Sequence, residues 1–211
     1  TLDDSKTHKL VLQGLFGMVN KVVSTAELIE RKQLANLKIK CLNLKYPEVE
    51  AKKVYGVKYF EELEFLTQNT ARNKYIRNLA LALKGNTLLL FQLVEKHGEI
   101  LHKLIQEKAD PKRKVFFVYG GTETDDREKI RAITEKSDNA IIVASFGTFS
   151  TGINIRNLHN IVFSSPTKSP IRVLQSIGRG LRVGDNKDSA TVYDISDDLT
   201  YKDKKNFTLT H

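Results

Sequence analysis

The strongest constraint on the fold of this 211-residue chain is a series of short apolar runs that begins near residue 86. The runs are rich in β-branched and aromatic residues and are nearly continuous rather than alternating. They cover residues 87–93, 114–119, 140–146, 160–164 and 190–195. Strands with this composition are typically covered on both faces, as in parallel sheets.

Amphipathic segments separate most of these runs. Residues 95–109 and 170–182 each place apolar side chains on one helical face, and residues 124–137 open with acidic side chains that suit a helix N-terminus. Because strands that alternate with helices build sheets with helices on both faces, we predict an α/β fold with a doubly wound, mainly parallel sheet.

The first third of the chain has a different pattern. Residues 10–16 and 25–34 are typical of helices, and residues 37–44 alternate like a half-buried strand. Residues 59–83 predict two helices that meet near residues 68–70.

Composition excludes several classes of protein. No apolar run is long enough for a membrane span, and the N-terminus lacks the apolar stretch of a signal peptide. Cys41 is the single cysteine, which excludes a disulfide framework and a cysteine zinc cluster, and we predict no metal site. We therefore expect a cytoplasmic protein. The C-terminus ends without a helix cap, so we expect residues 206–211 to form a cut or disordered tail.

The chain carries 34 Lys and Arg against 25 Asp and Glu, a formal charge of +9. A surplus of this size suits a polyanionic partner, nucleic acid before membrane. A generic basic surface explains the charge alone equally well.

The polar face of segment 170–182 combines one amide with guanidinium groups. At 100° per residue this face carries Arg172, Gln175, Arg179 and Arg182. The opposite face would pack on the sheet through Val173, Leu174, Ile177 and Leu181. Arginine forks suit phosphate and cannot be discharged. A solvated basic face is the alternative, but the string Q-x-x-G-R-x-x-R is far more specific than a basic stripe.

Two glycines, Gly178 and Gly180, lie within the same segment. Each costs about 1 kcal/mol of helix propensity relative to alanine. We expect the close approach of a ligand or of a neighbouring backbone to explain them.

Two further segments directly follow predicted strands, where open parallel sheets bind ligands. Residues 144–155 form a predicted loop of hydroxyl and glycine residues that contains Ser145, Gly152 and Asn154. Residues 119–122 read Y-G-G-T, and paired glycines before a helix let backbone amides approach a phosphate. Ordinary polar turns are the alternative for both.

A complete nucleotide site is missing from the sequence. No G-x-x-x-x-G-K-[S/T] loop is present, because the nearest match in spacing, Gly147 to Gly152, continues with isoleucine and asparagine rather than with lysine and a hydroxyl residue. The acidic pairs at 125–126 and 197–198 lie in polar segments, where we expect them to be exposed. The pattern therefore predicts half of a nucleotide pocket, with the other half supplied from elsewhere.

In order and spacing these segments resemble the second RecA-like domain of superfamily 2 helicases, in the branch that includes XPB-type and phage DNA helicases. Residues 175–182 are similar to motif VI, 144–154 to motif V and 87–93 to motif IV. Y-G-G-T resembles the intervening segment that contacts nucleic acid. The resemblance covers nearly the whole chain. It implies a short remnant of a preceding motor domain and crossover at 1–36, the second RecA-like domain at 37–205, and a truncated tail at 206–211.

The resemblance also implies residue roles. Arg182 would be the arginine finger, Arg179 would face the γ-phosphate, and Gln175 would orient the phosphate or the attacking water. The residues near the nucleotide would be Gly152, Asn154 and Arg172. The residues on the nucleic-acid backbone would be Ser145, Gly120, Gly121 and Thr122. Asn154 stands where the family usually has aspartate, and Ser145 where it usually has threonine.

The implied function is the C-terminal motor half of an ATP-dependent DNA helicase or translocase that acts in recombination, repair or replication. ATP and Mg²⁺ would bind mainly to the first RecA-like domain of the same protein. The partner would be branched, forked or RNA-hybrid DNA, and the protein would be monomeric, in the host cytoplasm if phage-encoded. This chain alone would be inactive as an ATPase.

One alternative is a free-standing basic α/β module that binds nucleic acid without ATPase activity, which the missing P-loop and the charge of +9 would also fit. A flavodoxin-like enzyme is disfavoured, because no acid/base pair or redox thiol lies in a suitable place.

Overall fold

The computed structural model describes residues 6–18, 23–152, 155–167, 169–183 and 187–209. The chain divides into two compact units, Thr1–Leu34 and Ala35–His211. The boundary lies two residues before the one predicted at 36/37.

The first unit contains α1 (Lys6–Phe16) and α2 (Thr25–Glu30). A capping box starts α2, because the Glu27 amide donates to Ser24 Oγ (3.2 Å) and the Ser24 amide donates to the Glu27 carboxylate (2.7 Å). This helix is shorter than the predicted segment 25–34. It ends at Glu30, and Lys32 takes a left-handed backbone conformation with φ 57°.

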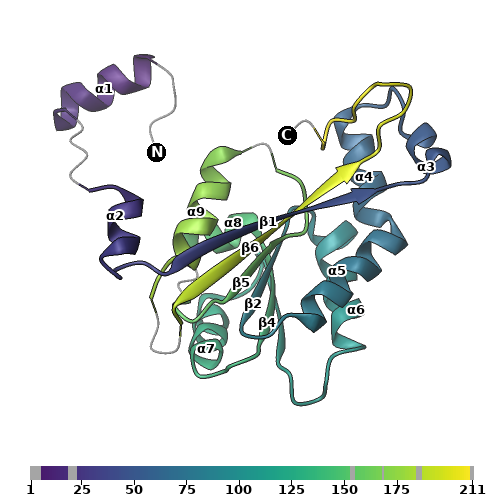
Figure 1. Ribbon diagram of the computed structural model, residues 1–211. Coiled ribbons are helices and arrows are strands. Elements are labelled where there is room, and N and C mark those ends of the chain that lie inside the picture. Colours follow the sequence, from purple (N-terminus) through teal and green to yellow (C-terminus); the bar gives the residue numbers. More distant parts are fainter. Residues whose placement is uncertain (1–5, 19–22, 153–154, 168, 184–186, 210–211) are drawn as a thin grey trace. The chain divides into compact units, whose positions relative to one another are not determined.

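The second unit is built on one six-stranded sheet with the order β1-β6-β5-β2-β4-β3, in which every neighbouring pair is parallel (Figure 1). The strands are β1 (Asn36–Lys45), β2 (Thr87–Phe91), β3 (Val115–Val118), β4 (Ile141–Ser145), β5 (Asn160–Phe163) and β6 (Ser189–Asp198). The predicted doubly wound, parallel α/β architecture is confirmed.

Helices cover both faces of this sheet, with α5 and α6 on one side and α7, α8 and α9 on the other (Figure 1). Their bounds are α3 (Glu48–Lys53), α4 (Tyr59–Gln68), α5 (Thr70–Ala82), α6 (Glu99–Gln106), α7 (Thr124–Glu135), α8 (Phe146–Gly152) and α9 (Pro170–Gly180). A π-helical turn, η1 (Val94–Gly98), precedes α6, so residues 95–109 are not one regular helix. The predicted break near 68–70 falls at Asn69, whose side chain caps α5.

The central strand shows why the apolar runs do not alternate. All five residues of β2 are buried, and successive side chains enter different cores. Leu88 and Leu90 pack in the cluster under α8 and α9, whereas Leu89 and Phe91 pack in the cluster under α5 and α6. A strand buried on both faces needs apolar residues at every position.

The prediction that both residues of the acidic pair 197–198 are exposed is wrong, because Asp197 is fully buried. Strand β6 continues to Asp198, and Asp197 receives two hydrogen bonds from Arg72, Nε to Oδ1 at 2.8 Å and Nη2 to Oδ2 at 2.9 Å. The hydroxyl of Tyr46 donates to the same carboxylate at 2.7 Å. Burial, together with the charge of Asp197, raises the pKa of Tyr46. The buried carboxylate is therefore paired with a cation and accepts three hydrogen bonds.

The prediction of a cut or disordered tail at 206–211 is wrong for residues 206–208, which form hydrogen bonds with the rest of the domain. The buried carboxylate of Glu62 on α4 accepts hydrogen bonds from the backbone amides of Phe207 and Thr208 and from the side chains of Asn206 and Thr208. Residues 210–211 lie outside the described residues. None of the helices in the described ranges is long and apolar enough to cross a membrane.

Candidate functional site at the carboxyl edge of the sheet

All three predicted site segments leave the same edge of the sheet. Residues 119–122 follow β3, residues 145–152 follow β4, and the connection to α9 follows β5. Strand spacing of about 4.8 Å places β5 and β3 about 14 Å apart, with β2 and β4 between them. The structure thus brings the predicted site residues to one edge. One group follows β4 and β5, and a second group follows β3.

Helices α8 and α9 form the first group and pack against each other. The segment after β4 is α8 rather than the predicted loop, because Phe146 and Phe149 are both buried in the core beneath it. The guanidinium of Arg179 lies over the ring of Phe149, 5.5 Å from its centroid. A cation over an aromatic face is held in position by the ring quadrupole. Phe149 is therefore a positioning residue for Arg179, which the sequence analysis missed.

The polar face of α9 is as predicted for three of its four members. Arg172 and Gln175 are exposed, and Arg179 follows on the same face at helical spacing. The helix ends at Gly180, however, so Arg182 lies beyond the helix rather than on its face. The pKa of Arg179 is lowered, first by its own burial and second by the positive charge of Arg182, which therefore lies nearby. Two guanidinium groups near each other favour an anion between them.

The apolar face of α9 is narrower than predicted. Val173 and Ile177 pack on the sheet core and Leu181 is buried, but Leu174 is 56% exposed. The prediction that Leu174 packs on the sheet is therefore wrong.

A buried lysine fixes the position of Arg182. The ammonium of Lys187 donates to three backbone carbonyls, those of Gly180 (2.5 Å), Arg182 (3.0 Å) and Arg156 (3.2 Å). Burial lowers the pKa of Lys187 to about 8. A cation at a helix C-terminus satisfies carbonyls that have no partner within the helix. Nothing in the sequence distinguishes Lys187 from the other lysines, so this role could not be predicted.

The two glycines of α9 have different surroundings. A Cβ atom on Gly180 would lie 2.5 Å from Cδ1 of Ile161 on β5, so alanine there would force the end of the Ile161 side chain to shift. A Cβ atom on Gly178 would meet nothing within 4 Å. At Gly180 the close neighbour is thus a side chain rather than the expected ligand or backbone, and Gly178 has open space beside it.

Ser145 caps the first turn of α8. Its hydroxyl lies 2.8 Å from the hydroxyl of Thr148 and accepts from the Thr148 amide at 3.3 Å. Gly152 is the last residue of α8, and Asn154 lies outside the described residues. The nucleotide role predicted for Asn154 therefore stays a prediction.

The turn at 119–122 forms the second group. The Thr122 amide donates to the carbonyl of Tyr119, the Tyr119 amide donates to Thr122 Oγ1, and both distances are 3.0 Å. Arg127 on α7 donates to the carbonyl of Gly120 at 3.0 Å. Gly120 and Gly121 are exposed, and a Cβ atom on Gly120 would meet nothing within 4 Å. Hydrogen bonds within the turn and from Arg127 thus hold its backbone in place, while both glycines are exposed to solvent.

A buried histidine anchors the connection between β5 and α9. The amide of Gln92 donates to Ser165 Oγ (3.2 Å), which lies 2.8 Å from Nδ1 of His97. Burial lowers the pKa of His97, so its ring is neutral, and one hydrogen bond joins Nδ1 to the hydroxyl of Ser165. This contact joins two segments 68 residues apart, and no pattern within either segment predicts it.

No group of three or more His, Cys, Asp or Glu in the described ranges could hold a metal ion.

We compared the chain with known protein families, sequences and structures. Residues 71–184 match the model of the helicase conserved C-terminal domain. The chain is 39% identical over 207 residues to the ATP-dependent DNA helicase uvsW of Enterobacteria phage T4, a match that covers 97% of this chain and 40% of that protein. The chain therefore spans less than half the length of this curated relative.

Two solved structures share the fold. The crystal structure of T4 UvsW is 37% identical, covers 84% of this chain and 38% of its own, and superposes with a TM-score of 0.71. The ATP-dependent Type ISP restriction-modification enzyme LlaBIII, solved bound to DNA, is 16% identical. That match covers 85% of this chain and 13% of LlaBIII, with a TM-score of 0.59, and shows the fold alone.

Proposed function

This chain belongs to the family of helicase conserved C-terminal domains, and we propose that it is the C-terminal motor half of an ATP-dependent DNA helicase or translocase. The predicted resemblance to the second RecA-like domain of superfamily 2 helicases is confirmed. The activity of the whole protein, its substrates and its partners are part of the proposal.

The observation that carries the proposal is the arginine group at the end of α9. Arg172 and Gln175 are exposed, and the partly buried Arg179 lies on the same face of α9. Arg182 follows the helix, and Lys187 donates to its carbonyl. Arginine keeps its charge at any working pH, and its fork matches phosphate oxygens. Phe149 and Lys187 hold this group from within the fold, as a site that must meet a ligand in one geometry requires.

We assign this group to the γ-phosphate of ATP carried on another RecA-like lobe of the same protein. When bound, ATP supplies the phosphoryl group that is transferred to water. Arg182 acts as the arginine finger, Arg179 faces the γ-phosphate, and Gln175 orients the phosphate or the water. An arginine finger accelerates phosphoryl transfer about 10³–10⁵-fold, which corresponds to about 4–7 kcal/mol.

Attraction between these arginines and the triphosphate closes the cleft between the lobes, and loss of that charge after hydrolysis lets the lobes reopen. Each cycle then shifts the grip on the nucleic-acid backbone. In this proposal the backbone contacts come from Ser145 and from the turn with Gly120, Gly121 and Thr122. Gly152, Asn154 and Arg172 lie near the nucleotide.

ATP and Mg²⁺ are proposed to bind mainly to the other lobe. The described residues hold no cluster that fits a metal ion by itself. None of the roles given to this chain depends on such a cluster.

The test is Arg182→Ala in the complete protein. We expect ATP turnover to fall about 10³-fold or more, while the fold and most of the DNA binding remain. Arg77→Ala is the matched control, because Arg77 lies on α5 and, within the described ranges, its side chain forms hydrogen bonds only with that of Asn78. Unchanged turnover in Arg182→Ala would contradict the finger assignment.

The second candidate is the nucleic-acid-binding module without ATPase activity, which the charge of +9 favours. The coding sequence upstream decides between the two. A G-K-[S/T] loop about one domain length before this chain supports the motor. A complete protein without such a loop, and without ATP turnover on DNA, supports the module.

The proposed substrate is DNA in forked, branched or RNA-hybrid form, with roles in recombination, repair or replication. The proposed protein is a monomer, in the host cytoplasm if phage-encoded. Unwinding by the complete protein on forked, R-loop and four-way substrates, measured side by side, tests this assignment. Equal activity on a plain duplex would remove the preference for branched DNA.

A further inference from the structure

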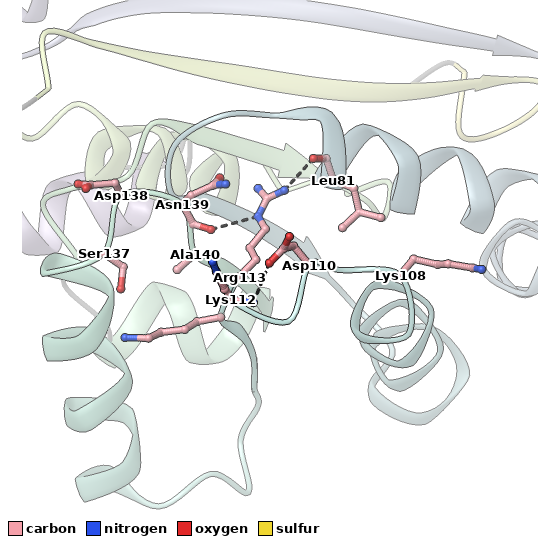
Figure 2. A pocket seen from close by; sticks show the side chains of 10 residues that line it. Leu81, Lys108, Asp110, Lys112, Arg113, Ser137, Asp138, Asn139 and Ala140 are labelled. Atoms are coloured by element: carbon pink, nitrogen blue, oxygen red, sulfur yellow. Dashed lines mark hydrogen bonds between the residues drawn. The ribbon is translucent and has the colours of Figure 1, made fainter.

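A hollow of about 630 Å³ lies at the edge of the sheet opposite the candidate site (Figure 2). Its walls come from the end of α5, from the connection into β3 and from the connection into β4. The lining residues are Leu81, Lys108, Asp110, Lys112, Arg113, Lys114, Ser137, Asp138, Asn139 and Ala140. Because these connections precede the strands, the hollow faces away from the arginines of α9.

The guanidinium of Arg113 is held rigidly inside this hollow. It donates to the carbonyls of Asn139 (Nε, 3.0 Å), Leu81 (Nη1, 2.7 Å) and Leu83 (Nη2, 2.8 Å). No carboxylate among the described residues forms an ion pair with it, and burial lowers its pKa. Arginine stays charged regardless. Its charge is therefore compensated only by backbone dipoles.

Three exposed lysines, Lys108, Lys112 and Lys114, surround this fixed charge. The side chains of Lys108 and Lys112 extend to opposite sides of Arg113 (Figure 2). In the described part of the chain none of the three lysines forms an ion pair. The tight turn at 110–113, closed by the Arg113 amide on the Asp110 carbonyl at 2.8 Å, presents these cations together.

The hollow therefore has four positive charges against two carboxylates, Asp110 and Asp138. One of the carboxylates is tied into the turn, because Asp110 accepts from the Lys112 amide at 2.8 Å. Like charges around a concave surface add their fields and attract anions. None of the lining residues is aromatic, so the hollow has no surface on which a base could stack. The chemistry favours phosphate groups over a nucleoside.

We propose that this hollow binds the phosphate backbone of duplex DNA, as a second contact away from the motor cleft. The inference rests on the proposed function for its choice of DNA over another polyanion. Contacts of this kind fix the duplex without reading its sequence. A duplex arm held there stays with the domain while the candidate site at the opposite edge moves along a strand.

The test is duplex binding by the 211-residue chain over a range of salt concentrations. The variant K108A/K112A/K114A leaves Arg113 in place, so the fold is kept. The control K38A/K52A/K74A removes the same charge from exposed lysines outside the hollow that form no ion pair in the described part of the chain. Thermal unfolding of both variants verifies that they fold.

We expect the hollow variant to bind the duplex at least about tenfold more weakly at low salt. Its slope of log K against log salt should fall by about 2–3, since each phosphate contact contributes about 0.9. The control should change both quantities much less. Equal losses in the two variants would overturn the proposal, because total charge would then explain binding.

Inorganic phosphate, followed by its ³¹P signal, separates a duplex site from a small-anion site. If the hollow variant loses phosphate binding but keeps duplex binding, the proposal is overturned. The readout is independent of ATP turnover, so failure of the Arg182 assignment leaves the result of this test intact.

Discussion

Two regions of the domain use arginine in opposite ways. The side chain of Arg72 on α5 is fully buried and forms a bidentate pair with Asp197 at the end of β6. On α9, Arg172 is exposed and forms no ion pair among the described residues. In the first region the charges satisfy each other inside the fold. In the second the fold positions the charges but leaves them facing outward, which is the arrangement that a ligand from outside requires.

The first consequence of this comparison concerns the acidic pair at 197–198. We expect Asp197→Ala to lower the free energy of unfolding by about 3–5 kcal/mol, because it leaves Arg72 buried without a partner. Asp198→Ala removes a hydrogen bond to the Thr200 amide and solvent-exposed attraction to Lys45 and Lys205, and should cost less than about 1 kcal/mol. Urea denaturation of the 211-residue chain measures both. If both variants lost less than about 1 kcal/mol, burial of Arg72 would not need Asp197 as its partner. The contrast between the two regions would then be wrong.

Lys187 is buried beside the C-terminal end of α9 and should make the stability of the domain depend on pH. The unfolded chain holds this proton up to pH 10.5, but the folded chain releases it near pH 8. Between these values the unfolded state binds more protons, so the free energy of unfolding rises with pH. One pKa unit is worth about 1.4 kcal/mol, so the full shift from 10.5 to about 8 would correspond to roughly 3.4 kcal/mol. We expect a smaller rise of about 2 kcal/mol, because the three carbonyl acceptors favour the ammonium and oppose the shift.

Denaturant titrations at pH 8 to 10.5 measure this rise, and Lys187→Met serves as the reference in which it should vanish. An identical pH dependence in both proteins would show that Lys187 keeps its ordinary pKa.

The smallest expected effects separate structural from ligand-facing positions within α9. Gly180→Ala places a Cβ atom against Ile161 and should destabilise the domain by about 1–2 kcal/mol. Gly178→Ala has open space and should stabilise it by up to about 1 kcal/mol. Thermal denaturation gives both signs. Destabilisation by Gly178→Ala would show that the fold, and not a ligand, requires this glycine.

The fold class was predictable because two physical patterns carry it. Continuous apolar runs such as residues 87–93 mark strands buried on both faces, and helical periodicity marks the segments between them. The shared face of Arg172, Gln175 and Arg179 was predictable for the same reason, since helical spacing is a local property.

The errors arose where distant residues decide the structure. Asp197 is polar in sequence, and only Arg72 and Tyr46, more than a hundred residues away, make its burial stable. Residues 206–208 are ordered by Glu62, again a distant partner. The positions of Arg179 and Arg182 depend on Phe149 and Lys187. None of these pairings follows from the periodicity of a single segment.

The strand order has a consequence for how this domain forms during synthesis. Strand β6, the last of the sheet in sequence, lies between β1 and β5 and pairs with β1 from Asn36↔Ser189 to Lys45↔Asp198. Until the ribosome has released β6, β1 has no neighbouring strand and β5 has an open edge. Pairings between such distant segments form slowly, and open edges attract other chains. The nascent domain is therefore exposed to aggregation until nearly all of it has been translated.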